Sequence, residues 1–113
     1  MSLFEITHAQ RAGWQRRAAG ELAAILDAHP HLPIIAWTLA PSGSLVVGQV
    51  NGPAPAEQLR ATFEHWRSAL RLAEPHEVTF SGGSVLLTTQ AAFNHVRIKL
   101  TATLPPDARQ VTP

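Results

Sequence analysis

The feature that most constrains the fold is the alternation of residue types in residues 96–104, VRIKLTATL. Every second position of this stretch is apolar: Val96, Ile98, Leu100, Ala102 and Leu104. Successive side chains of a β-strand point to opposite faces of a sheet, so the pattern predicts a strand with an apolar face and a polar face. The chain is therefore expected to contain a sheet.

Two further pairs of β-rich runs are each joined by a turn. Residues 34–39 (IIAWTL) and 45–50 (LVVGQV) flank a Pro-Ser-Gly sequence, and residues 77–80 and 85–90 flank a Ser-Gly-Gly-Ser sequence. Turn-forming residues between two β-rich runs predict hairpins. Both runs of the first pair are apolar on both faces, which predicts strands in the middle of the sheet or covered on each side.

A first helix is predicted over about residues 7–28. Thr7 and Gln10 fit the capping box, in which two side chains three positions apart bond to each other's backbone N–H groups. Pro30 prevents the helix from continuing because it has no N–H group. The face expected to be buried holds Trp14, Ala18, Leu22, Ile25 and Leu26.

A second helix is predicted from Pro55, which suits the first helical position, to about Leu72. One narrow stripe of this helix is apolar and consists of Leu59, Phe63, Trp66 and Leu70. The column beside the stripe is basic and consists of Arg60, Arg67 and Arg71. The spacing predicts a helix that buries its apolar stripe and keeps the guanidinium groups in solvent at the margin.

These elements predict an α+β fold. Their order is helix, two strands, helix and three strands, which favours a two-layer sandwich with a mostly antiparallel sheet of about five strands. Both helices are expected on one face of the sheet. A single core commonly serves a chain of this length, so residues 1–104 are predicted to form one domain. Residues 105–113 (PPDARQVTP) are expected to form a flexible tail.

Composition excludes several classes of function. The chain of 113 residues has no cysteine, which excludes thiolate nucleophiles, disulfides, iron–sulfur clusters and cysteine-ligated zinc. The net charge of +1 is small for a dedicated nucleic-acid-binding domain, which usually carries clustered basic charge. No apolar run is long enough to span a bilayer, and the N-terminal residues lack the pattern of a signal peptide. We therefore expect a cytoplasmic protein.

Sequence motifs for catalysis, metal binding or cofactor binding are missing. His29 and His31 lie two positions apart, but no HExxH-type motif or carboxylate cluster accompanies them. We expect His29 to close the C-terminus of the first helix, where a partial positive charge is favourable. The sequence also lacks a nucleophile motif, paired carboxylates on one element and a glycine-rich phosphate loop that opens a helix. The prediction is a protein that is not an enzyme and has no catalytic residue, cofactor or metal.

Two functions remain. Strands that are apolar on both faces need a second cover, and a copy of the same chain can supply it through a twofold interface. The favoured prediction is a non-catalytic interaction or regulatory accessory module that forms a homodimer through its sheet and has room for a further protein partner. The alternative is weak, sequence-nonspecific binding of nucleic acid through basic side chains that grip phosphates. The residues predicted for that role are Arg60, Arg67, Arg71, Arg97 and Lys99.

Two long stretches of the sequence carry a resemblance. EITHAQRAGWQRRAAGELAAILDAHPHLP and the following IAWTLAPSGSLVVGQVNG resemble a group of small uncharacterised proteins from high-GC actinobacteria, especially streptomycetes. The similarity covers roughly residues 1–104. The resemblance implies a bacterial, cytoplasmic protein, and it brings no established activity, catalytic motif or binding residue with it.

Overall fold

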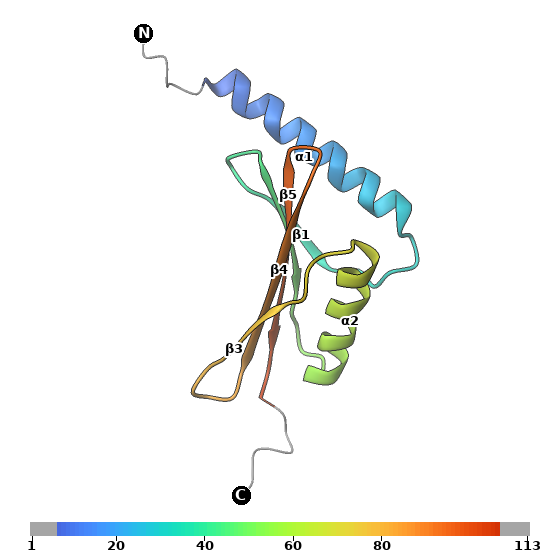
Figure 1. The fold of residues 1–113 in the computed structure, drawn as a ribbon, viewed down its shortest axis with the longest axis vertical. Coiled ribbons are helices and arrows are strands. Elements are labelled where there is room, and N and C mark those ends of the chain that lie inside the picture. The colour runs from blue at the N-terminus through green and yellow to red at the C-terminus, as the bar shows by residue number, and fades with distance from the viewer. Residues whose placement is uncertain (1–6, 107–113) are drawn as a thin grey trace, which may run out of the picture.

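The structure, a computed structural model, describes residues 7–106 and is α+β (Figure 1). The elements are α1 (His8–Ala28), β1 (Ala36–Leu39), β2 (Leu45–Val50), α2 (Ala56–Ala69), β3 (His76–Thr79), β4 (Val85–Phe93) and β5 (Val96–Leu104). The predicted fold class and the predicted order of helices and strands are therefore confirmed. Most of the predicted tail, residues 107–113, lies outside the described residues, as do residues 1–6.

Both ends of α1 are set by the residues that the sequence indicates. The Thr7 hydroxyl accepts a hydrogen bond from the Gln10 N–H group at 3.1 Å, and the Gln10 side chain accepts one from the Thr7 N–H group at 2.9 Å. This reciprocal pair is the predicted capping box, and it satisfies two backbone donors at the helix start. His29 is the C-cap, as predicted, and its N–H group donates to the Leu26 carbonyl.

α1 packs on the rest of the fold through a narrower stripe than its sequence predicts. Ala18 is fully buried, and Leu22 and Ile25 are half-buried against the core. Leu26, however, is 42% exposed, so the prediction that it faces the core is wrong. The reason is that α1 crosses the end of the sheet and does not lie along its strands (Figure 1).

α2 supplies most of the core from the helical side. Pro55 has extended backbone angles and is the N-cap, one position before the place that the sequence predicts for it. The helix ends at Ala69, earlier than predicted, because Arg71 has a φ of 55° and turns the chain away in a left-handed conformation. The predicted apolar stripe is nevertheless buried in full and consists of Leu59, Phe63, Trp66 and Leu70.

The five strands form one sheet in the order β1-β2-β5-β4-β3. All neighbouring pairs are antiparallel except β2 and β5, which run parallel and are connected through α2 and the β3–β4 hairpin. β2 is an interior strand, as its apolar sequence predicts. β1 lies at an edge of the sheet, so the prediction of a central or doubly covered strand is wrong for β1.

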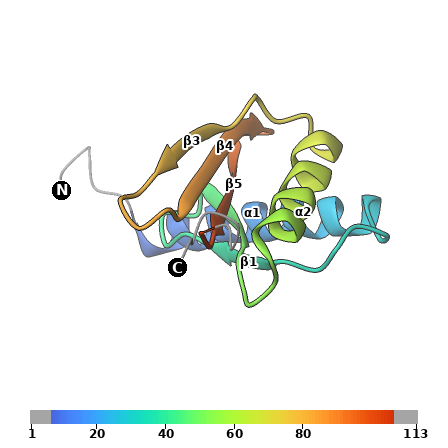
Figure 2. The ribbon, with the colours of Figure 1, turned by 90° about the horizontal axis from the view of Figure 1, so that it is seen from below.

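β5 lies at the centre of the sheet and shows the alternation that its sequence predicts. Its buried residues are Val96, Ile98, Leu100, Ala102 and Leu104. Val46 and Val50 of β2 lie opposite Ile98 and Ala102 in the strand register and share their face. The core therefore forms between this face, which we call the inner face, and α2, with part of α1 added at one end (Figure 2).

Candidate interaction surface

The opposite face of the sheet, which we call the outer face, is not covered by either helix. It consists of the residues that alternate with the buried ones in each strand, such as Val47 in β2, Leu86 in β4 and Lys99 in β5. None of the residues at these positions is fully buried in the described structure. A solvated sheet face normally carries polar side chains, whereas Leu45, Val47 and Leu86 make this face partly apolar.

The ionisable side chains of the outer face are all basic. Arg97 and Lys99 lie two positions apart on β5, and His76 of β3 is placed on the same face by the register. The cross-strand neighbours of Arg97 and Lys99 are apolar or uncharged, and neither residue forms an ion pair with another described residue. The outer face thus combines apolar surface with a small positive charge.

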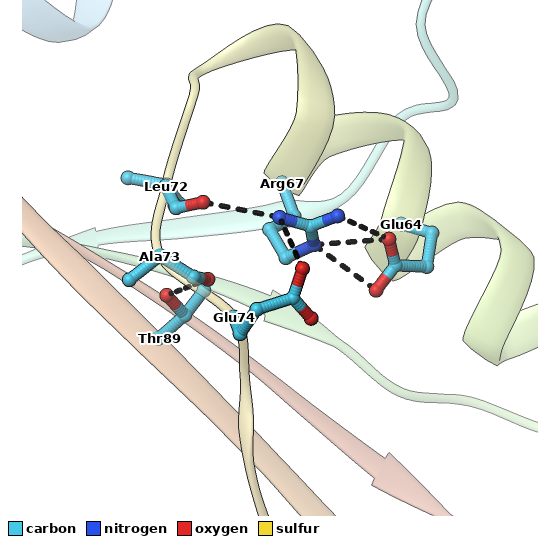
Figure 3. A network of polar contacts seen from close by, with 6 residues as sticks. All are labelled: Glu64, Arg67, Leu72, Ala73, Glu74 and Thr89. Carbon is cyan, nitrogen blue, oxygen red and sulfur yellow. Dashed lines mark hydrogen bonds and ion pairs between the residues drawn. The ribbon is translucent and has the colours of Figure 1, made fainter.

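Arg67 joins the end of α2 to the loop that follows it (Figure 3). Its guanidinium group donates to both carboxylate oxygens of Glu64, at 2.9 and 3.1 Å, and to the Leu72 carbonyl at 3.1 Å. A second carboxylate, that of Glu74, lies 4.0 Å away. The hydrogen bond to Glu64 raises the pKa of Arg67 above its ordinary value. Arg67 therefore stabilises the helix end and does not project freely into solvent.

The structure separates the five residues that the sequence suggests for nucleic-acid binding. Arg60 and Arg67 belong to α2, on the inner side of the sheet, and Arg60 pairs with Glu77 of β3 at 3.0 Å. Arg71, just after α2, is exposed. Arg97 and Lys99 lie on the outer face. The five side chains therefore do not form one surface, and two of them already have carboxylate partners.

Replacing Arg67 with alanine is expected to lower the midpoint of urea denaturation more than replacing Arg60. The Arg67 change removes the hydrogen bonds to Glu64 and to the Leu72 carbonyl, whereas the Arg60–Glu77 pair is about half exposed, at 48% and 49%. An exposed pair of that kind contributes at most about 1 kcal/mol. Urea titrations of the two variants at one protein concentration give the comparison. Equal midpoints would contradict the stabilising role of Arg67.

A polar hollow of about 320 Å³ lies where the loop before β3 meets β4. Glu74, His76 and Lys99 line it, together with Thr89. The Thr89 hydroxyl donates to the Ala73 carbonyl at 2.7 Å (Figure 3), so it fixes the loop to β4 and is not free to act as a nucleophile. The sequence does not predict this grouping, because only the strand order brings the three segments together.

The histidines considered for metal binding lie in different environments. His29 is half-buried and its ring lies edge-on to Trp66, with 6.3 Å between the ring centroids. His31 is exposed in the loop before β1. Among residues 7–106, no three His, Asp or Glu side chains lie close enough together to hold a metal ion.

Large apolar side chains are exposed along the two edges of the sheet. Ile34, two residues before the start of β1, is 100% exposed. Val78 in β3 and Phe80 directly after it are 39% and 50% exposed. The sequence places all three in β-rich runs but does not indicate which strands lie at the edges. Exposed apolar side chains beside the unpaired edges of a sheet are typical of surfaces that bind another protein.

Comparison with known proteins does not identify a family for this chain. No protein-family model matches the chain, and no curated protein matches it. Within the part of the chain that the structure describes, no helix is both long enough and apolar enough to cross a membrane. The open sheet is the feature from which a function can be inferred.

Proposed function

We propose that this protein is a non-catalytic interaction module of the bacterial cytoplasm that associates with a second copy of itself and acts as a regulatory or accessory partner. The observation that carries the proposal is the open sheet. Ile34, Val78 and Phe80 are exposed along its edges, and no described helix covers the apolar residues of its outer face.

Self-association follows from the physical chemistry of such a sheet. Unpaired strand edges present N–H and C=O groups that bind other strands. Burial of apolar surface contributes about 25 cal/mol for each Å² removed from water. Only 15% of the residues are charged, so few like charges keep two copies apart. A twofold dimer covers the same surface on both copies at once.

Nucleic-acid binding is the second candidate function, and one observation favours it. Arg97 and Lys99 lie on the open face without a carboxylate partner among the described residues. Two basic side chains contact few phosphates, so binding would be weak and would not select a sequence. The logarithm of its affinity would fall with the logarithm of salt concentration at a slope of about −2.

We expect light scattering after gel filtration to give a mass of about twice 12.2 kDa at micromolar concentration. The dimer should have the absorbance spectrum of a protein without nucleic acid. A mass of one copy at every accessible concentration would remove self-association from the proposal. Nucleic acid that remains bound at low salt and is lost at high salt would support the second candidate.

A further inference from the structure

β1 is an edge strand, and its outward backbone groups have no partner in the described structure. β1 pairs with β2 alone, and the bond from the Ala40 N–H group to the Leu45 carbonyl fixes which residues face β2. The direction of hydrogen bonding alternates along an antiparallel pair, so Thr38, like Ala40, bonds to β2. Trp37 and Leu39 therefore direct their N–H and C=O groups away from the sheet.

The β1 edge is short but lacks the charge, proline and bulge that often keep edge strands from pairing. β1 contains no charged residue and no proline, and its register with β2 is continuous. Ile34, two residues before the start of β1, is wholly exposed. β3, at the other edge, carries His76 and Glu77, and Glu77 is bound to Arg60. Only the β1 edge is thus free of charge.

An uncharged groove of about 510 Å³ lies beside this edge, between β1, β2 and α2. Ile35, Val50 and Leu59 contribute apolar surface to it, and no charged residue lines it. Ile34 borders the groove while its side chain is in solvent. A protruding apolar side chain and a groove therefore lie next to each other on the same edge. A twofold contact requires this kind of self-complementary surface.

A second copy fits this edge better than it fits the outer face. A twofold contact through the outer faces would bring Arg97 and Lys99 towards the same residues of the other copy, and like charges repel. The β1 edge and its groove carry no charged residue, so a twofold contact there brings no like charges together. The free backbone groups of β1 are also complementary to those of an identical strand that runs antiparallel.

We infer that two copies pair through β1, antiparallel and about a twofold axis, to form one continuous ten-stranded sheet. The inference rests on the proposed self-association and assigns its surface. The axis passes beside Ala36, so Ile34 of each copy lies opposite Thr38 of the other and next to Ala36, which lines the other copy's groove. The axis is perpendicular to the sheet, so the two outer faces, with Arg97 and Lys99, lie on the same side and stay open to a further partner.

Ile34→Lys tests the interface without disturbing the fold of one copy, because the Ile34 side chain is fully exposed. The variant removes an apolar contact and places two like charges near the twofold axis. We expect the dissociation constant of the dimer, measured by light scattering over a dilution series, to rise at least about 30-fold, as for the loss of a hot-spot contact. Val78→Lys is the matched control, since it adds the same charge at the opposite edge and should leave the dissociation constant unchanged.

Spin-label distances test the geometry independently, and the chain without cysteine allows labels at single introduced cysteines. Labels at Ala36 of the two copies should lie close together, because Ala36 is exposed and the axis passes beside it. Labels at His76 should lie about 40 Å apart, because nine strand spacings of about 4.8 Å separate the two β3 strands.

The possible results separate this inference from the proposed function. A wild-type chain that stays monomeric would remove the self-association and the β1 interface together. A wild-type dimer that tolerates Ile34→Lys and holds its His76 labels close together would overturn pairing through β1, and it would leave self-association through another surface intact. Dissociation by Ile34→Lys with distant His76 labels supports the inference.

Discussion

Replacing Trp66 with alanine is expected to lower the free energy of unfolding by about 3 to 5 kcal/mol, as removal of a large buried side chain does. Trp66 is 2% exposed. Its ring lies edge-on to that of Trp37, with 5.4 Å between the ring centroids, and its Nε1–H group donates to the Pro33 carbonyl at 2.7 Å. Alanine leaves a cavity, removes the aromatic contact and leaves the carbonyl without its donor, so all three changes destabilise.

Urea denaturation at one fixed protein concentration measures the loss, because the proposed dimerisation would make the midpoint depend on concentration. Trp66→Phe keeps an aromatic ring but loses the Nε1–H donor, and we expect it to cost about 1 to 2 kcal/mol. Trp14→Ala is the control for the loss of an indole, and its effect should be smaller because Trp14 is only half-buried. A Trp66→Ala protein as stable as the parent would show that Trp66 is not a core residue.

The stretch FEHWRSALR, residues 63–71, shows how far local pattern determines the fold. Its apolar spacing predicts that Phe63 and Trp66 are buried, and both are. That prediction succeeds because the helical period depends only on local backbone geometry. The same spacing places Arg67 at the margin of the stripe but does not reveal its bond to the Leu72 carbonyl. That bond depends on how the chain turns after the helix.

Strand order is the part of the fold that sequence pattern does not predict, since pairing joins residues far apart in the chain. The apolar run IIAWTL is typical of an interior strand, yet its place at the edge makes the same residues an exposed surface. Gly48 is a further example, because the reason for a glycine at this position lies on the neighbouring strand. Glycine weakens a strand, but a Cβ atom at Gly48 would lie 2.8 Å from the ring of Trp37 on the neighbouring strand.

The candidate surface was predictable only in its general character. The sequence predicts an open sheet with one face that the helices leave uncovered, and the structure has such a sheet. The basic residues of α2 and those of β5 lie on opposite sides of the sheet. This separation was not predictable, because it depends on which face of the sheet α2 covers. The exposure of Ile34 likewise depends on β1 being an edge strand.

Gly43→Ala is expected to cost about 2 to 5 kcal/mol and to loosen α1 from the sheet. Gly43 is buried in the turn between β1 and β2 and has a φ of 75°, a left-handed conformation that costs an alanine about 1 to 2 kcal/mol. An added Cβ atom would lie 2.7 Å from both the Gln15 backbone nitrogen and the Trp14 Cβ atom. Neither atom can move without shifting α1, and overpacking of this kind costs about a further 1 to 3 kcal/mol.

α1 is the element expected to move, because Ala18 is its only fully buried residue in the described structure. Hydrogen exchange should therefore show faster exchange of α1 amides near Gln15, while the amides of β5 stay protected. Gly82→Ala, in the turn between β3 and β4, is the matched control. An added Cβ atom there has no neighbour within 4 Å, so its effect should stay within about 0.5 kcal/mol. Unchanged stability and unchanged α1 exchange in Gly43→Ala would mean that α1 does not rest on this turn.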